Sequence, residues 1–218
     1  MRTIDPDTEG PDTSDPDTEE LVRRAGGGDG AAVEALFERN RARLSQMIRL
    51  RMDPRMRGRI DPSDVIQETL VAASQRLPRY ATERPLPFYP WLRQIAWEKL
   101  VHLHDRHLRA AKRSVAREQF FRPDISDESA QELAHRLVGT TSSPSADAVR
   151  QEVRERVRQA LEELSVDDRE VLLLRYLEQM SSKEIGAILD VSEAAVNMRH
   201  MRALERIRRV LSDMGDES

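Results

Sequence analysis

The clearest chemistry in this sequence comes from arginines near its C-terminal end. Five arginines lie within residues 199–209, a stretch that holds Glu205 as its single acid. A guanidinium group donates hydrogen bonds in a planar fork that fits both the guanine edge and phosphate oxygens. Because apolar positions recur at helical spacing between these arginines, they predict a helix that contacts nucleic acid.

A helix that starts near Glu193, with Ser192 as its N-cap, divides these residues between two faces. At about 100° per residue, the inward stripe consists of Val196, His200, Ala203, Ile207 and Leu211. The candidates for contact with DNA face outward or lie on the flanks: Ser192, Ala195, Asn197, Met198, Arg199 and Arg202. We expect Arg199 or Arg202 to pair with guanine and Asn197 with adenine. Contact of the arginines with phosphates alone is the alternative.

The elements that must position this helix lie directly before it. Residues 161–176 predict an amphipathic helix, and residues 181–203 predict a short helix, a tight turn and the basic helix. This order is typical of a helix-turn-helix. Gly186 lies in the short helix, where glycine costs about 1 kcal/mol of helix propensity. The acid pairs Glu162–Glu163 and Asp167–Asp168 fall at helix ends, where we expect solvation.

A second group of polar candidates lies on a predicted helix that begins at Asp61. Asp61 is a suitable N-cap, Pro62 suits the first helical turn, and Pro78 is expected to end the helix. The buried face is expected to consist of Val65, Ile66, Thr69, Leu70 and Ala73. An exposed face of acid and amide side chains remains, for which solvation is the simplest role: Asp64, Gln67 and Glu68.

A further predicted helix combines aromatic and basic side chains. It begins near Phe88 and runs to about Glu118 through residues 93–117, which hold seven bases and two acids. Its candidates for nucleic-acid contact are Phe88, Tyr89, Arg93, Trp97, Lys99, His102 and Arg106. Phe88 and Tyr89 can stack on bases. Core packing is nevertheless the first expectation for all four aromatic residues, with Trp91 inside and Trp97 at the rim, and base stacking is the alternative.

The composition favours an all-α fold, and the sequence shows no set of catalytic residues. Charged residues make up 34% of the chain and aromatic residues 4%, which is typical of helices with wet outer faces and small cores. The chain contains no cysteine, which excludes disulfides and thiolate metal sites. His102, His104 and His107 have no second cluster of ligands near them in the sequence. We therefore predict no catalytic residues, no metal and no cofactor, and a packed rather than ligating His200.

The charge is distributed unevenly along the chain. Residues 1–20 hold eight acids and one base, so the rest carries an excess of about three positive charges. We predict an acidic disordered tail at 1–20, a helical domain at 21–118, a flexible polar linker at 119–148 and a helix-turn-helix domain at 149–212. The tail either solubilises the chain or mimics DNA toward the basic patches. Signal-peptide and membrane-spanning patterns are absent, so we expect a cytoplasmic protein without membrane insertion.

Two polar segments need a separate interpretation. The glycine-rich residues 26–30 lack the Lys-Ser/Thr pair and the preceding strand of a phosphate loop, so they are interpreted as a turn. Asp29 is then expected to cap a helix over residues 31–51. Within the linker, a short helix is expected around Glu132–Leu137.

Three segments give the chain a family resemblance. They are Asp64–Thr69, Phe88–Ala96 and the helix-turn-helix from Leu164 to Glu193. In these segments and their order, the chain resembles bacterial extracytoplasmic-function (ECF) RNA polymerase sigma factors of the sigma-70 family, over about residues 20–118 and 149–211. The resemblance implies two small helical domains, one like sigma region 2 and one like region 4, which bind core RNA polymerase and promoter DNA.

The resemblance also implies a role for each group of candidates. Asp64, Gln67 and Glu68 would bind the clamp helices of the largest polymerase subunit. The candidates within residues 88–106 would melt and read the −10 element, and those within 192–202 would read the −35 element. Family members are commonly silenced by an anti-sigma factor, and the sequence leaves open whether this chain has one. The chain departs from the usual family pattern at Gly186, Asn197 and His200.

A free-standing helix-turn-helix regulator is the main alternative. Its first domain would sense a ligand or dimerise, and it would not need the segments at 64–69 and 88–96. An enzyme, such as a helical nuclease or phosphotransferase, is the third class, but the sequence has neither a set of metal ligands nor a phosphate loop. The sequence therefore predicts a non-enzymatic subunit that directs promoter recognition and transcription initiation.

Overall fold

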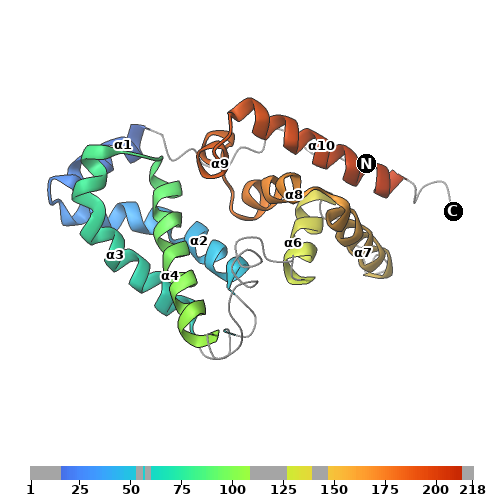
Figure 1. The fold of residues 1–218 in the computed structure, drawn as a ribbon, viewed down its shortest axis with the longest axis horizontal. Helices are drawn as coiled ribbons and strands as arrows, with labels where there is room; N and C mark the ends of the chain where they lie inside the picture. The colour runs from blue at the N-terminus through green and yellow to red at the C-terminus, as the bar shows by residue number, and fades with distance from the viewer. Residues whose placement is uncertain (1–15, 53–55, 57–59, 109–126, 139–146, 213–218) are drawn as a thin grey trace. The chain divides into compact units, whose positions relative to one another are not determined.

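The regular elements in the described part of the chain are all helices (Figure 1). No strand occurs among the residues that the computed structural model describes, which are 16–52, 56, 60–108, 127–138 and 147–212. Their contacts divide them into two compact units, one within residues 11–123 and one from residue 124 onward. The predicted all-α fold is confirmed.

The first unit surrounds one apolar core. Its helices, where the chain is described, are α1 (Pro16–Gly26), α2 (Gly30–Arg51), α3 (Pro62–Glu83) and α4 (Phe88–Leu108). Helices α1, α2 and α3 pack against one another, and α4 packs on α2 and α3. The core includes apolar side chains from the last three of these helices, among them Leu36, Leu44, Ile48, Ala73, Leu77, Leu92 and Leu100.

The helix ends in this unit follow simple capping chemistry. The Asp29 carboxylate accepts hydrogen bonds from the backbone N–H groups of Ala31 and Ala32 at 3.0 and 3.1 Å. Gly28, one residue earlier, has a φ of +91°, a conformation that glycine adopts without strain. Asp61 caps α3 in the same way. Both predicted N-caps are confirmed.

Two boundaries differ from those that the sequence predicts. The acidic tail was expected to reach residue 20, but α1 begins at Pro16 and the Thr18 side chain is buried. Pro78 was expected to end α3, which instead continues to Glu83. Pro78 is exposed, so water can satisfy the carbonyl group that its missing N–H leaves unpaired. The rest of the tail and the predicted continuation of α4 lie outside the described residues, at 1–15 and 109–118.

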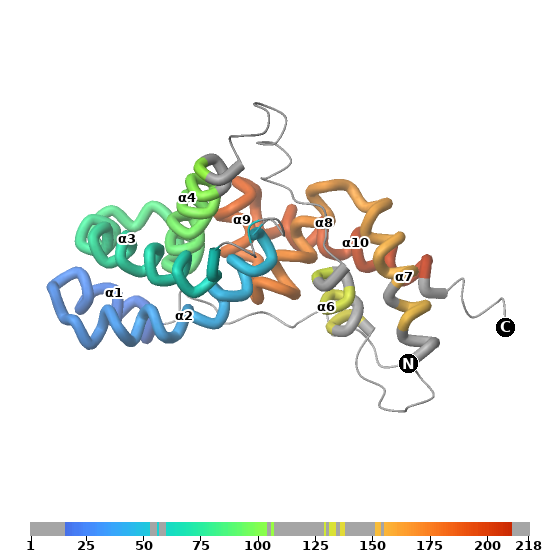
Figure 2. Tube along the Cα trace, turned by 90° about the horizontal axis from the view of Figure 1, so that it is seen from below, coloured from blue at the N-terminus to red at the C-terminus, as the bar shows by residue number. Residues whose placement is uncertain are grey.

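The second unit is built around its C-terminal helix. Its elements, as far as the chain is described, are α6 (Asp127–Val138), α7 (Asp147–Glu163), α8 (Val166–Leu172), η2 (Leu173–Leu177), α9 (Ser182–Leu189) and α10 (Glu193–Ser212). Element η2 is a single turn of π-helix that continues α8. Helix α10 packs on α7, α8 and α9, while α6 packs on α7 and η2 (Figure 2).

Helix α6 makes part of the predicted linker a packed element. The sequence indicates a short helix around Glu132–Leu137, whereas α6 extends over twelve residues with Leu133 and Leu137 buried. The Arg136 guanidinium donates a hydrogen bond to the backbone carbonyl of Tyr176. Because these contacts attach α6 to the second unit, residues 127–138 do not behave as a polar linker.

Candidate nucleic-acid interface

Helices α9 and α10 form a tightly capped helix-turn-helix. Ser181 and Glu184 make a capping box at the start of α9, in which each backbone N–H donates to the other side chain. Helix α9 ends at Leu189, and its C-cap residue Asp190 has a φ of +54°, which turns the chain toward α10. The Ser192 hydroxyl accepts from the backbone N–H of Ala195 at 3.2 Å, so the predicted N-cap of the basic helix is confirmed.

Gly186 permits the close approach of the two helices. The backbone N–H of Val191 donates to the Gly186 carbonyl at 3.1 Å. A Cβ atom on Gly186 would lie 2.7 Å from the carbonyl oxygen of Val191, much closer than van der Waals contact. The sequence indicates only a loss of helix propensity here, whereas the structure gives the residue a steric reason.

We expect Gly186→Ala to lower the free energy of unfolding of the second unit by about 1–2 kcal/mol, because the overlap with backbone outweighs the gain in propensity. Far-UV circular dichroism in urea measures it. Gly30→Ala is the matched control, since a Cβ atom there meets open space. Both tryptophans, Trp91 and Trp97, lie in the first unit, so the fluorescence transition should not move in Gly186→Ala. A more stable Gly186→Ala protein would contradict the steric argument.

The inner face of α10 is the one that the sequence predicts. Val196, His200, Ala203 and Ile207 are buried, and the Leu211 side chain lies outside the described part. Leu204, which the predicted stripe omits, is buried as well.

His200 is packed as predicted. Its Nε2 atom lies 3.0 Å from the Tyr176 hydroxyl, with which it shares a hydrogen bond. Burial, together with the positive charges of Arg175 and Arg208, lowers the pKa of His200 to about 4. The imidazole is therefore neutral at pH 7.

The outer face of α10 is exposed and partly apolar. Met198 and Met201 expose 65% and 44% of their surface, although both are large apolar side chains. Asn197 and Arg202 are exposed beside them, and Ala195 and Arg199 are half-buried on the flanks. The candidates within residues 192–202 therefore lie together at the start and in the N-terminal half of α10.

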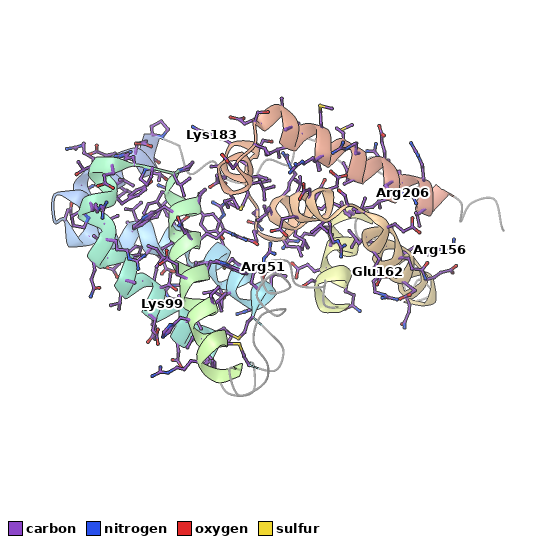
Figure 3. The ribbon with its side chains drawn as sticks, viewed as in Figure 1. Arg51, Lys99, Arg156, Glu162, Lys183 and Arg206 are labelled. Atoms are coloured by element: carbon purple, nitrogen blue, oxygen red, sulfur yellow. The ribbon has the colours of Figure 1, made fainter. Side chains whose placement is uncertain are left out.

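The arginines of α10 pair with acids from α7 and α8. Arg199 lies 3.2 Å from Asp167 and Arg202 lies 3.0 Å from Asp168. The next arginine along the helix, Arg206, which is labelled in Figure 3, pairs with Glu163 at the end of α7. The sequence predicts solvated acids at 162–163 and 167–168. Glu162 and Glu163 are exposed as expected, whereas Asp168 is buried. Each pair joins residues that are more than thirty positions apart, so no local spacing in the sequence signals it.

A buried polar network also reaches the outer face. The Asn197 carbonyl oxygen Oδ1 accepts hydrogen bonds from the Ser182 hydroxyl at 2.7 Å and from the Arg175 guanidinium at 3.3 Å. Arg175 also donates to the Ser182 oxygen. Arg175 comes from the π-turn η2 and Ser182 from the first turn of α9, and both are buried. Sequence analysis did not identify either residue.

In the first unit, α3 presents a separate exposed surface. Val65, Ile66 and Thr69 face the core, and the Thr69 hydroxyl donates to the Val65 carbonyl at 2.7 Å. Val71, one turn after Glu68, exposes 60% of its surface. The α3 face is defined here as the exposed residues Asp64, Gln67, Glu68 and Val71. It combines charge with an apolar side chain, which the sequence did not single out.

The aromatic residues at the start of α4 are buried. Phe88 and Tyr89 are buried, and the Arg43 guanidinium lies 3.7 Å from the centre of the Tyr89 ring. Trp91 is buried and stacks on Tyr80 with ring centres 4.3 Å apart. Neither Phe88 nor Tyr89 presents a ring to a base in this conformation, because both rings are buried. Burial, which is the first expectation for these two aromatic residues, is what the structure shows, and their stacking on bases does not fit this conformation.

The basic candidates on α4 are only partly available. Arg93 is buried, while Trp97 is half-buried at the rim as expected. Lys99, labelled in Figure 3, is half-buried, and its amine lies 3.7 Å from the Glu68 carboxylate of the α3 face. His102 and Arg106 are exposed. Lys99, His102 and Arg106 share one side of α4 through their spacing of three and four residues, and this set is called the α4 basic stripe.

The described residues show neither a cluster of metal ligands nor a membrane-spanning helix. No group of three or more potential metal ligands occurs among the residues described. None of the helices, over the same residues, is long and apolar enough to cross a bilayer.

Comparisons with known proteins agree with this geometry. The family described as sigma-70, region 4 matches residues 154–207, which contain most of α7 and all of α8 and α9. The probable RNA polymerase sigma factor RfaY of Xanthomonas campestris pv. campestris is 32% identical over 148 residues, which are 68% of this chain and 33% of RfaY. The chain thus spans about a third of the length of that relative.

Two further relatives extend along nearly the whole chain. The ECF RNA polymerase sigma factor SigD of Mycobacterium tuberculosis is 29% identical over 198 residues, 91% of this chain and 85% of SigD. The structure of CnrH in complex with the cytosolic domain of CnrY is 26% identical, with a TM-score of 0.50, and covers 91% of this chain and 99% of CnrH. With the region 4 match on its helix-turn-helix and these similarities over both units, the chain belongs to the ECF RNA polymerase sigma factors of the sigma-70 family.

Proposed function

We propose that this sigma factor directs RNA polymerase to promoters by holding the DNA at two places, the −35 and the −10 element. The exposed N-terminal half of α10 in the helix-turn-helix is the observation that carries the proposal. Such a helix enters the major groove with its first residues against base edges. Arg199 and Arg202 suit guanine or phosphate, and the exposed Met198 suits a thymine methyl group. Ser192 and Ala195 lie at the start of α10, where they would approach the sugar-phosphate backbone of the DNA.

The α4 basic stripe is the proposed contact with the −10 element. His102 and Arg106 are exposed, and Lys99 can exchange its distant partner Glu68 for a phosphate because the pair is loose, at 3.7 Å. Phe88, Tyr89 and Arg93 lie on the same helix but are buried, so they hold it in its unit. Trp97 is half-buried. In this proposal the stripe contacts the separated strand electrostatically.

The α3 face is the proposed docking surface for core RNA polymerase. Its acids favour a basic partner, and an exposed Val71 beside them supplies an apolar centre of the kind found in protein interfaces. The partner is the pair of coiled-coil clamp helices of the largest subunit, by similarity to the family. Because both partners work in transcription, we propose that the chain acts in the cytoplasm.

A regulatory protein is a further proposed partner. The relative CnrH was solved with the cytosolic domain of CnrY bound to it. The likeness of the two chains supports a protein of the anti-sigma type for this chain, which would mask its polymerase and DNA surfaces.

Reconstitution with core RNA polymerase tests the proposed function. Transcript 5′ ends are mapped on genomic DNA with the core enzyme alone and with the core enzyme plus this chain. We expect starts that depend on the chain and share two upstream elements. Sequence-specific DNA binding without any chain-dependent start would instead support a free-standing regulator.

Arg202→Ala should weaken binding of the reconstituted enzyme to such a promoter about tenfold, because one guanidinium contact to a base is lost. Competition between promoter and unrelated DNA measures the effect. Arg209→Ala, on an exposed later turn of the same helix, is the control. It should weaken binding to all DNA sequences alike. It should also reduce the slope of log affinity against log salt concentration by about one. Unchanged promoter binding by the Arg202→Ala protein would contradict the assignment of α10.

A further inference from the structure

The recognition helix carries an asparagine whose amide group is already half engaged. Asn197 is exposed, yet its Oδ1 atom accepts from the Ser182 hydroxyl at 2.7 Å and from Arg175 Nη2 at 3.3 Å. Both donors are buried. The Asn197 carbonyl therefore points into the protein, toward the junction of η2 and α9.

Arg175 determines which way this amide points. A guanidinium group has five N–H donors and no acceptor. If the amide turned over, its Nδ2 amine would face those donors, and two hydrogens would meet without an acceptor between them. Ser182 could adapt by rotating its hydroxyl, but Arg175 cannot, and its buried position in η2 keeps it in place. The orientation with the carbonyl inward is thus chemically required.

The side-chain amide NH2 group of Asn197 is consequently the part of the amide that remains available to a ligand. Across the described residues, Nδ2 of Asn197 has no hydrogen-bond partner. It lies one residue before Met198, whose side chain is the more exposed of the two methionines on the outer face of α10. Two N–H groups are therefore available at the surface that is proposed to meet the major groove.

We infer that Asn197 meets DNA as a hydrogen-bond donor only, and so selects a base that presents acceptors. The inference rests on the proposed role of α10 at the −35 element. Pairing with adenine, as the sequence predicts for Asn197, needs both the carbonyl and the amine of the amide. Here the carbonyl is occupied, and that prediction does not fit the geometry.

The base preference follows from the donor and acceptor pattern in the major groove. Guanine offers two acceptors, N7 and O6, to the two hydrogens of the amine, and thymine offers O4. Adenine has its N6 donor beside N7, and cytosine presents the N4 donor. We expect guanine first and thymine second at the position that Asn197 contacts, with cytosine disfavoured. Ser182 and Arg175 act as positioning residues, since they orient the amide without touching the DNA.

Selection from a randomised −35 element by the reconstituted polymerase holoenzyme tests the inference. Wild type should show one position with the order guanine, thymine, adenine, cytosine. Asn197→Ala should flatten that position alone. Asn197→Asp keeps an acceptor toward Arg175 and Ser182 but turns a second acceptor outward, so cytosine should rise about tenfold relative to guanine there. Thermal melting followed by circular dichroism checks that each variant is folded.

Arg175→Met separates positioning from direct contact. It removes the donors that keep the Asn197 carbonyl inward, and the Ser182 hydroxyl can then face either end of the amide, so adenine should gain at the same position and at no other. In the Asn197→Ala background, Arg175→Met should have no effect on base selection at that position, because no amide remains to be oriented.

The outcomes distinguish the inference from the function on which it rests. A holoenzyme that selects no sequence at all would overturn the proposed function and the inference with it. A clear −35 motif that is identical in wild type, Asn197→Ala and Asn197→Asp would leave the function and overturn the inference. Adenine as the base preferred in an Asn197-dependent way would also overturn it, because the amide must then have turned over.

Discussion

Glu68→Lys should lower the affinity of this chain for core RNA polymerase about 30-fold, or about 2 kcal/mol, without unfolding it. The reversed charge would place an ammonium group against the basic partner that the α3 face favours. It would also lie near Lys99, whose amine is 3.7 Å from the native carboxylate. The side chain of Glu68 is 56% exposed, so the fold has no need of its charge. Fluorescence anisotropy of a labelled chain titrated with core enzyme measures the change.

Glu38→Lys is the matched control for this experiment. Glu38 is exposed on α2 of the same unit and pairs with Arg41 three residues later, in a surface contact worth little energy. The control changes the net charge equally but leaves the α3 face intact. Equal binding by wild type and Glu68→Lys, or an equal loss in both variants, would remove the α3 face as the docking surface.

Lowering the pH from 7 to 4 should destabilise the second unit by about 3 kcal/mol through His200 alone. The folded pKa of His200, about 4, lies below the ordinary value of 6.5, so the unfolded chain binds the proton more readily. The stabilisation is complete above pH 6.5 and is lost as the pH falls from 6.5 toward 4. Burial is the main cause, and the charges of Arg175 and Arg208 add to it.

His200→Leu isolates this contribution from the acids that also titrate near pH 4. The variant should lose the part of the pH dependence between 6.5 and 4 that wild type shows, although it gives up the hydrogen bond to Tyr176. Urea unfolding followed by far-UV circular dichroism from pH 4 to 8 measures the difference. Fluorescence of Trp91 and Trp97 reports the first unit, which should respond to pH equally in both proteins. Parallel curves for wild type and variant would refute the assignment.

Local signals in the sequence predicted the elements and their faces well. Asp29, Asp61 and Ser192 cap the helices that they precede, because a cap depends on residues two or three positions away. The buried stripe of α10 follows from helical periodicity in the same way. Pro78 was misleading, since a proline on the wet side of a helix is tolerated when the helix is held by its buried face.

Contacts between distant segments were beyond the reach of these signals. Asp168 and Arg202 are 34 residues apart, and their pairing depends on how α8 packs against α10. The same is true of Asn197, whose partners come from η2 and α9. Phe88 and Tyr89 show the opposite difficulty, because an aromatic residue before a basic helix fits a base-stacking role and a core role equally. The tertiary fold decides between the two roles.

The pairing of α10 arginines with acids has a consequence for the search for promoters. Arg199, Arg202 and Arg206 must each leave a carboxylate before they reach a phosphate. A stretch of bulk genomic DNA that offers phosphates alone replaces one ion pair by another and gains little, whereas a matched site adds base contacts. Residence on random DNA is thereby shortened more than residence at a promoter. The salt dependence of binding should accordingly be shallower than five arginines in this helix would suggest.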